Sequence, residues 1–406
     1  MSFQNNITTY LFGIILFLLL PNFCWGQEKV MSEQFFQQVV ESLNVSYQDL
    51  NDQKKVHFPW IDEYQLRTES RDFKLEEQEY TFRLSPVTPG MRKAQKDLLT
   101  HLRMQPLIRE NSFYEETLYA SYQDWLSLYV AHETKALLQE LQAVLNDKIL
   151  LNQKYLGTYE VDFKELIRLE KDKNNLGIDI FEIELQEELI RQKYNYSNAQ
   201  LDFSDMIRIG AISFRLGTET VTPSNSIASE FNYESLLVDK EIALERAEQR
   251  RFFDFAQFRY RGPHENELVE RFSIGLGLAF PNSGNAKLKQ AELRIKQEEL
   301  AFEQKLDQQR LELDQALLIE DIQFQILAFN NFVSIKEKEA KNLDDIAKLI
   351  TKREGFEPSL ILDIKENELQ AKLETINRKA SIYRDYLKYL DASALLYALP
   401  FRNLFR

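Results

Sequence analysis

Two stretches of the chain alternate between apolar and polar residues and then change to a helical period. From Phe272 to Ala279, one side of the alternation is apolar, and its members are Phe272, Ile274, Leu276 and Leu278. A period of two predicts a strand with two different faces. Pro281 to Gly284 ends the strand pattern, and a sequence rich in Lys, Gln, Glu and Leu then indicates a very long helix.

The same passage occurs earlier in the chain. Tyr80, Phe82 and Leu84 alternate with polar residues, a break follows from Pro86 to Gly90, and a helical pattern opens at Met91. The two passages lie about half a chain apart, which predicts an internal duplication. In each half the pattern predicts a helix, two strands that form a hairpin, a long helix and a returning helix.

These patterns give expected boundaries for the whole chain. We predict a signal peptide over 1–26, a first repeat over 27–201, a connector over 202–232, a second repeat over 233–399 and a C-terminal tail over 400–406. The expected strands are about 62–69, 79–85, 255–261 and 270–280, the long helices about 91–154 and 285–352, and the returning helices about 162–200 and 359–398. Pro106 is predicted to kink the first long helix.

The long helices carry a coiled-coil rhythm. Leu137, Leu141 and Val144 step by four and three, and Lys148 is one polar interruption in this seam. The second long helix and both returning helices keep the same spacing, which predicts helices that pack lengthwise. Turn-forming residues predict the reversals between paired helices near Gly157 and over 355–359.

The N-terminal segment indicates export. The apolar run from Tyr10 to Leu20 is short for a membrane helix, and the small residues Cys24 and Gly26 suit a cleavage site before Gln27. Cys24 is the only cysteine, so the mature chain would hold no disulfide; a lipidated Cys24 remains an alternative. No stretch after the signal segment is apolar enough for a membrane helix. If the protein crosses a membrane, it would therefore do so with strands.

Charge and residue spacing exclude several classes of function. The net charge of −14 lies entirely after the signal segment, and no basic stripe suits nucleic acid. The four histidines, His57, His101, His132 and His264, are scattered without metal-ligand spacing. Gly275-x-Gly277 lacks the third glycine of a dinucleotide loop and is expected to ease packing within a strand. We therefore expect no enzyme, cofactor or metal site.

The predicted strands are too few to form a closed sheet within one chain, which predicts an assembly of several chains. Four short strands cannot close a barrel, and their edges would stay exposed. Three copies would supply twelve strands, an even number that a membrane barrel permits. The expected fold class is mostly α with a small β part, in which the repeated unit trimerises into a 12-strand β-barrel continuous with a 12-helix α-barrel. The strand residues expected to face lipid are Phe258, Tyr260, Phe272, Ile274, Leu276 and Leu278.

The chain resembles the TolC-like outer-membrane efflux proteins. The resemblance covers nearly all of the mature chain and rests on the duplicated plan and on the passage GLAFPNSGNAKLKQAEL, from Gly277 to Leu293. It also rests on Lys352-Arg353-Glu354-Gly355 followed by Ser359-Leu360-Ile361-Leu362-Asp363-Ile364, which is similar to the family's helix-reversal motif. The order and spacing of these features carry the likeness more than any one residue does.

The resemblance implies a conduit. Such proteins are trimers with a sheet barrel in the outer membrane and a helical barrel in the periplasm, where a periplasmic adaptor and an inner-membrane pump, here of unknown class, meet the helix-reversal tips. Those tips correspond to Gly157, Gly355 and Ser359. The family's acidic entrance ring falls on Asp363, with Glu366 on the same helical face. A ring of carboxylates would favour cations; the plainer interpretation is that both are solvated coiled-coil charges.

Two other interpretations stay open. The first is a periplasmic adaptor or coiled-coil spacer without a transmembrane barrel, although adaptors usually carry one helical hairpin and this chain has two, each after a strand pair. The second keeps the helical barrel but has a sheet too reduced to span lipid, as charged residues in or beside the strands suggest: Arg67, Glu69, Arg83 and Arg259.

Overall fold

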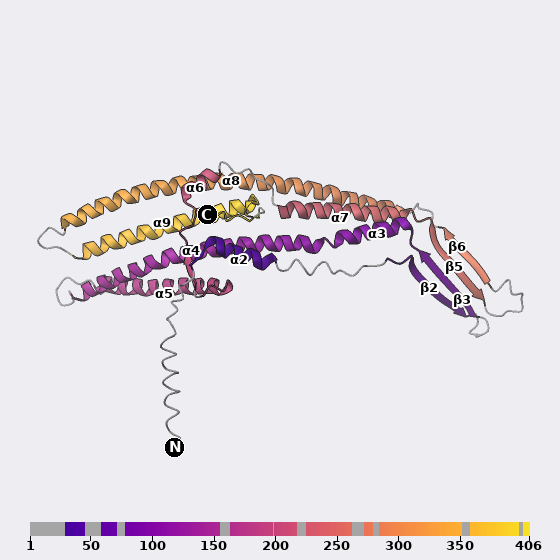
Figure 1. Ribbon diagram of the computed structural model, residues 1–406, viewed down its shortest axis with the longest axis horizontal. Helices are drawn as coiled ribbons and strands as arrows, with labels where there is room; N and C mark the ends of the chain where they lie inside the picture. Colours follow the sequence, from indigo (N-terminus) through magenta and orange to yellow (C-terminus); the bar gives the residue numbers. More distant parts are fainter. Residues whose placement is uncertain are drawn as a thin grey trace, which may run out of the picture.

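A computed structural model describes residues 29–44, 58–70, 78–154, 163–197, 199–216, 225–261, 272–278, 284–350, 358–397 and 401–406. The molecule is elongated, with a bundle of long helices and a small sheet at one end (Figure 1). In the described part of the chain, no helix combines the length and the apolar character that crossing a bilayer requires. The predicted signal peptide and the reversal glycines Gly157 and Gly355 lie outside the described residues.

The two hairpins, the long helices and the returning helices occur in the predicted order, and several short elements besides them were not predicted. The first half contains β1 (Lys29–Met31), α2 (Ser32–Asn44), β2 (Ile61–Ser70), β3 (Gln78–Pro86), α3 (Pro89–Leu102), α4 (Gln105–Lys154) and α5 (Phe163–Lys193). The second half contains β4 (Gln200–Asp202), α6 (Ile209–Leu216), α7 (Asn225–Gln249), β5 (Phe253–Arg261), β6 (Phe272–Leu278), α8 (Gly284–Ile350), α9 (Pro358–Ala392) and the short 3₁₀ turn η4 (Leu395–Tyr397).

The first long helix differs from the prediction. It is not one kinked helix over 91–154 but two helices, because α3 ends at Leu102 and α4 begins at Gln105. Pro106 is therefore the second residue of a new helix. A proline in the first turn is well tolerated there, since its missing N–H would have had no helical partner. Pro106 marks a helix start where we expected a kink.

Three further boundaries differ. The second returning helix was expected to reach residue 398, but α9 ends at Ala392, and Ala394 follows with a left-handed φ of 55°. The predicted connector 202–232 contains α6, and α7 already begins at Asn225 rather than near 233. The first returning helix was expected to reach residue 200, but α5 ends at Lys193, and Asn195 follows with a left-handed φ of 60°. Asparagine is one of the few residues that tolerate this conformation, which ends a helix efficiently.

The main sheet joins the two halves of the chain. Its strands lie in the order β2-β3-β5-β6, and all neighbours are antiparallel. The central pair β3 and β5 comes from different halves, with Phe82 opposite Phe258. A second sheet of two parallel strands, β1 and β4, lies near the middle of the molecule.

The long helices form a layer with a fixed order. Away from the sheet, α5 packs on α4, α4 on α9, and α9 on α8, whereas toward the sheet α3 packs on α7 and α7 on α8 (Figure 1). Thus α5 and α8 lie at opposite edges of the layer, and the middle contact, between α4 and α9, joins the two halves.

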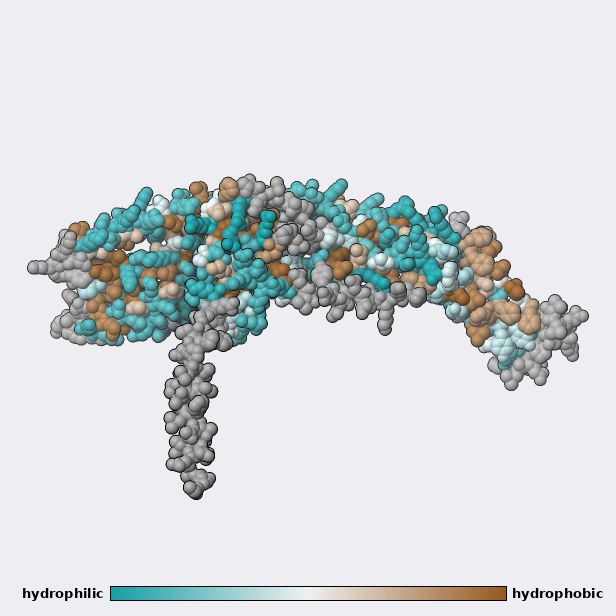
Figure 2. Space-filling view, viewed as in Figure 1, coloured by the Kyte–Doolittle hydropathy of each residue, from teal (hydrophilic) through white to brown (hydrophobic). Residues whose placement is uncertain are grey.

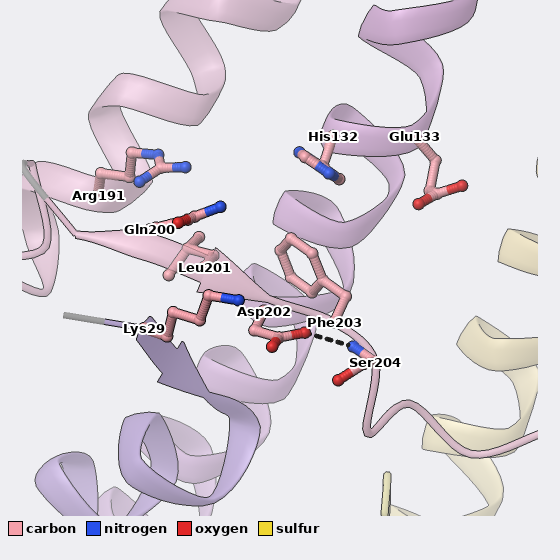
Figure 3. Close-up of a pocket in the computed structure, with 9 residues that line it drawn as sticks. All are labelled: Lys29, His132, Glu133, Arg191, Gln200, Leu201, Asp202, Phe203 and Ser204. Carbon is pink, nitrogen blue, oxygen red and sulfur yellow. Dashed lines mark hydrogen bonds between the residues drawn. The ribbon is translucent and has the colours of Figure 1, made fainter. Parts of the chain in front are cut away.

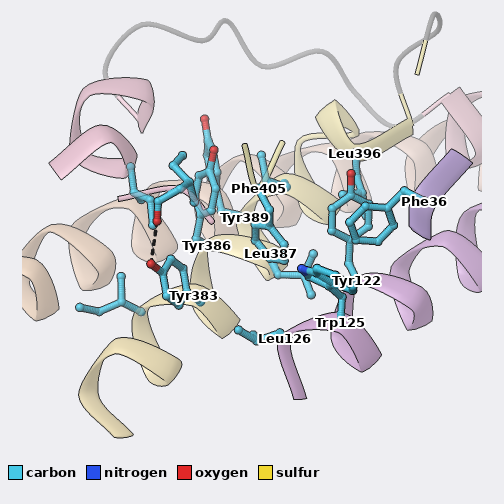
Figure 4. Packing of buried hydrophobic residues seen from close by; sticks show 14 of the residues in the cluster. Phe36, Tyr122, Trp125, Leu126, Tyr383, Tyr386, Leu387, Tyr389, Leu396 and Phe405 are labelled. Carbon is cyan, nitrogen blue, oxygen red and sulfur yellow. Dashed lines mark hydrogen bonds between the residues drawn. The ribbon is translucent and has the colours of Figure 1, made fainter. Parts of the chain in front are cut away.

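The main core lies at the middle of the molecule, and aromatic residues supply its largest buried side chains (Figure 4). Trp125 and Tyr122 of α4 are fully buried, and the Tyr122 ring stacks on Phe36 of α2 with 3.9 Å between centroids. Tyr383 of α9 donates a hydrogen bond of 2.6 Å to the carbonyl of Ile207. This core, which we call the waist, is completed within a single chain.

Candidate functional site

The main sheet has one apolar face. Because opposite residues in antiparallel strands share a face, three rows of apolar or uncharged side chains cross all four strands: Tyr64-Leu84-Ala256-Leu276, Leu66-Phe82-Phe258-Ile274 and Thr68-Tyr80-Tyr260-Phe272. Five of the six strand residues predicted to face lipid stand in these rows, and Leu278 follows Leu276 on the same face. Figure 2 shows the resulting hydrophobic surface over the sheet.

This apolar face is uncovered in a single chain. Ile274 is 78% exposed, and Leu66, Phe258 and Phe272 are also exposed. A soluble monomer rarely shows so large a contiguous apolar surface, so such a face marks contact with lipid or with another protein. The outer strands β2 and β6 pair with no further strand among the residues described. Both the face and the edges therefore need partners from outside the chain.

The opposite face of the sheet is polar, and its charges pair with one another. Arg259 and Arg261 both contact the carboxylate of Glu79, with N–O distances of 2.6 and 3.4 Å. Arg83 lies 3.4 Å from Asp254. A face of partly exposed ion pairs suits contact with water. The sheet thus separates an apolar side from a hydrated side.

A glycine makes one close contact on the polar face possible. Phe255 lies opposite Gly277, and a Cβ atom added to Gly277 would lie 2.3 Å from the Phe255 ring. The guanidinium of Arg83 lies 3.5 Å from the centroid of the same ring, a cation–π geometry. The expectation that glycine here eases packing is met at Gly277, but no pattern in the sequence indicated which ring approaches it.

The two predicted gate residues share one lysine. Lys148 of α4 donates hydrogen bonds to Oδ1 of Asp363 and Oε2 of Glu366, both on α9. The Lys148 side chain is only 11% exposed, whereas that of Asp363 is 55% exposed. We call Lys148, Asp363 and Glu366 the gate cluster. The acidic pair is therefore partly neutralised within the chain, a feature that the sequence-based prediction did not contain.

Lys148 stays charged at this position. Burial by itself would lower its pKa, but the hydrogen bonds and negative charges of Asp363 and Glu366 outweigh burial, so the pKa of Lys148 is raised above its ordinary value. Lys148 is the polar interruption in the α4 seam, which directs its side chain toward α9. A polar group in a coiled-coil seam costs stability but specifies one alignment of the helices.

A groove runs along the end of the helical layer that lies away from the sheet. It has a volume of about 510 Å³ between α8 and α9, and its lining mixes apolar residues such as Val333 and Leu343 with charged ones such as Glu337 and Lys372. Ser359, the remaining predicted tip residue, is the second residue of α9. The groove and Ser359 therefore belong to the same helical pair.

A second hollow lies beside β4 and has a volume of about 400 Å³ (Figure 3). Its lining residues are Lys29, His132, Glu133, Arg191, Gln200, Leu201, Asp202, Phe203 and Ser204. Arg191 is bonded to Glu187 and to the Ala199 carbonyl, and Asp202 accepts from the Ser204 N–H at 2.9 Å. These two charged groups already have partners within the chain, which favours a structural role.

The histidines within the described part also have structural surroundings. Buried His101 lies 2.8 Å from the Tyr233 carbonyl, and the His132 ring lies 5.5 Å from that of Phe203. Among the described residues, no group of three or more His, Cys, Asp or Glu is placed to hold a metal ion.

Comparison with known proteins gives a fold. No family model and no curated protein matches the chain. Among solved structures, CusC has a TM-score of 0.56 at 11% identity, over 93% of this chain and 95% of that one. The CmeC outer membrane channel of Campylobacter jejuni has a TM-score of 0.53 at 14% identity, over 88% and 80%. The outer membrane protein VceC of Vibrio cholerae has a TM-score of 0.54 at 10% identity, over 89% and 91%.

The similarity extends over most of both chains in each of these three pairs. Identities this low establish the fold alone. The duplicated strand-to-helix passage predicted this combination of long helices and a small sheet. The chain has the fold of the TolC-like outer-membrane channels.

Proposed function

We propose that this protein is the outer-membrane channel subunit of a tripartite export system, a passive conduit without enzymatic activity. The observation that carries the proposal is the two-faced sheet at one end of the helical layer. Its apolar face is exposed, its opposite face carries paired charges, and its edge strands are open. A membrane barrel needs an apolar outer surface, a polar lumen and closed edges.

Exposed stripes on the two edge helices support a closed ring. On α8, Leu317, Phe324 and Leu327 are exposed and follow one another at intervals of seven and three residues. On α5, Ile178 and Phe181 begin a comparable exposed stripe, which continues through Leu185 and Leu189. Both have the spacing of a coiled-coil seam. Because α5 and α8 lie at opposite edges, α8 of one copy would meet α5 of the next.

A ring of this kind is heterologous, and it closes only at a fixed number of copies. Three copies, each contributing the four strands of the main sheet, would give a barrel of twelve strands. One threefold axis that relates the copies would bury both the open strands of the sheet and the outer helices of the layer. We therefore propose a homotrimer in the outer membrane that extends into the periplasm, with export directed by residues 1–26.

The far end of the helical layer is the proposed docking end. The groove between α8 and α9 and the reversals near Gly157, Gly355 and Ser359 would meet a periplasmic adaptor, and an inner-membrane pump would supply the energy. The gate cluster lies in the same region of α9. In this proposal Asp363 and Glu366 line the entrance, and Lys148 restrains it by joining α9 to α4.

Site-directed labelling tests the membrane assignment. The cysteine variants Phe258→Cys and Leu276→Cys of the full chain would carry a fluorophore, and lipids with a spin-labelled tail would quench it on contact. Gln65→Cys, on the polar face of β2, is the matched control. We expect strong quenching at both apolar positions and little at Gln65, in a protein that fractionates with the outer membrane as a trimer. A monomer in the soluble periplasm would contradict the proposal.

One observation favours a second candidate, a helical tube whose sheet does not cross lipid. Charged residues stand within three of its strands, Arg67 and Glu69 in β2, Arg83 in β3 and Arg259 in β5, and a charged side chain is costly wherever it meets lipid. This candidate predicts a trimer in which neither Phe258→Cys nor Leu276→Cys is quenched. The same labelling experiment therefore separates the two candidates.

A further inference from the structure

Basic residues gather where the helices meet the sheet. α3 and α8 each follow a strand, and the fourth residue of each is a cation, Arg92 in α3 and Lys287 in α8. Neither helix has an acidic residue in its first turn. Since the start of a helix is electrostatically positive, it favours acidic side chains there. Both halves of the chain thus place a cation where helix stability alone disfavours it.

Large exposed apolar residues lie at the same level. Trp60 precedes β2 and is 62% exposed, and Phe252 precedes β5 and is also exposed. The guanidinium of Arg92 lies 4.2 Å from the centroid of the Trp60 ring, and the Trp60 carbonyl accepts the Val87 N–H at 2.8 Å. Trp is enriched at the boundary between lipid and water, where its apolar ring and polar N–H are both accommodated.

Three cations at this level have no acidic partner within ion-pair distance in the described part of the chain. They are Lys93, Arg250 and Lys287, and all three side chains are exposed. Several nearby carboxylates are already paired. Asp62 and Asp254 contact Arg251, and Glu245 contacts Lys289 at 2.8 Å. The unpaired positive charge is therefore available to an outside anion.

We infer that Trp60, Arg92, Lys93, Arg250, Phe252 and Lys287, which we call the collar, bind the phosphate groups of phospholipids. The lipids belong to the leaflet that faces the helices, and their binding fixes the depth at which the sheet sits in the membrane. This inference rests on the proposed membrane function. Figure 1 shows the start of α3, the end of α7 and the start of α8 together beside the sheet.

The combination of charge and apolar surface selects a phospholipid over a free anion. Next to the collar, the apolar face of the sheet continues through exposed Leu278 and Leu276. A soluble anion would neutralise the cations but leave Trp60 and Phe252 in water. A phospholipid satisfies both surfaces, because its tails cover the apolar face and its phosphate lies among the cations.

Quenching of Trp60 tests the inference. The full chain in detergent would be titrated with phosphatidylglycerol that carries a spin label near the headgroup, and in parallel with a diacylglycerol that has the same labelled tails but no phosphate. The signal of a Trp60→Phe variant, which retains the other tryptophans, is subtracted. We expect phosphatidylglycerol to quench Trp60 at a concentration at least about fivefold lower than diacylglycerol does, the factor expected for one cation near an anionic surface.

A variant in which three cations of the collar are neutralised provides the second part of the test. Lys93→Gln combined with Arg250→Gln and Lys287→Gln should remove most of the preference for phosphatidylglycerol and leave the Arg92–Trp60 contact in place. The matched control neutralises three exposed lysines far from the sheet, Lys171→Gln, Lys338→Gln and Lys341→Gln, and should keep the preference. Inorganic phosphate should compete only weakly; full displacement by it at equal concentration would overturn a lipid site in favour of a free-anion site.

Failure of this inference is distinguishable from failure of the proposed function. Equal quenching of Trp60 by the two lipids in the unaltered protein would overturn phosphate binding, yet a label at Phe258 would still be quenched. If neither Trp60 nor a label at Phe258 is quenched, both the collar and the membrane assignment are wrong.

Discussion

The waist and the sheet use aromatic residues in opposite ways. At the waist, Trp125, Tyr122 and Phe36 are fully buried by elements of one chain. In the sheet, Phe258 and Phe272 are exposed although the pairing of β5 with β6 is regular around them. The difference shows which part of the fold is complete in one copy. The waist is buried within one chain, whereas the apolar face and the edge strands of the sheet are left uncovered among the described residues.

The largest expected effect is at the waist. Trp125→Ala should lower the free energy of unfolding by about 3–5 kcal/mol, because it removes a large buried ring and leaves a cavity. Phe258→Ala, on the apolar face of the sheet, should cost less than about 1 kcal/mol in detergent. Chemical denaturation followed by circular dichroism measures both. Equal losses at the two positions would contradict the contrast between waist and sheet.

The next effect concerns membrane insertion. Ile274→Arg places a charge on the apolar face and should cost about 2–4 kcal/mol of insertion free energy if the position lies near the bilayer centre. Gln257→Arg is the control, since it adds the same charge to the opposite face. Folding into vesicles, monitored by resistance to protease, should fail for the first variant and succeed for the second.

A smaller effect is expected from the close contact on the polar face. Gly277→Ala should destabilise the sheet by about 1–3 kcal/mol, because the added methyl group overlaps the Phe255 ring. The double variant Gly277→Ala with Phe255→Ala should recover part of this loss, since the second change removes the overlapping ring. Thermal unfolding in detergent measures both, and an unchanged melting temperature for Gly277→Ala would contradict the contact.

The smallest effect is at the gate cluster. Lys148→Gln removes the charge that joins α4 to α9 and should shift the closed-to-open balance by about 1 kcal/mol, the upper range for partly exposed ion pairs. Single-channel recording should then show more frequent opening and stronger cation preference. Lys171→Gln, an exposed lysine on α5, is the control and should change neither property.

The same cluster predicts a pH dependence. The pKa of Lys148 is raised in the folded protein, so its stabilising contribution is fully present below the ordinary lysine pKa of about 10.4 and is lost as pH rises through the raised value. Under the proposed channel function, opening should therefore increase at strongly alkaline pH in the unaltered protein. In Lys148→Gln this part of the pH response should be absent.

The sequence allowed the architecture to be predicted because its signals are local. The alternation from Phe272 to Leu278 and the change of period after it can be seen in neighbouring residues, and β6 and α8 lie there. The comparison with solved structures confirms the fold that this resemblance implied. Pro106 was misinterpreted because proline occurs both at kinks within helices and in the first turn of helices. Only the structure shows that α3 ends at Leu102 and that a new helix begins at Gln105.

The contacts within the gate cluster could not be predicted from the sequence. Lys148 was recognised as a polar interruption, but its partners Asp363 and Glu366 lie more than two hundred residues away along the chain. No spacing rule connects positions in separate halves, because their contact depends on how α4 and α9 align. The collar was missed for the same reason, since its residues come from three helix ends and two loops.

The order of the helices in the layer has a consequence for symmetry. Its two outer members, α5 and α8, come from different halves of the duplicated chain, as do its two inner members, α4 and α9. In the proposed ring, every junction would join a first half to a second half, whether it falls inside a chain or between chains. The tube would thus consist of six half-units in alternating order. Three of its six junctions would lie within a chain and three between chains, and the covalent connection within a chain would be what distinguishes the two kinds.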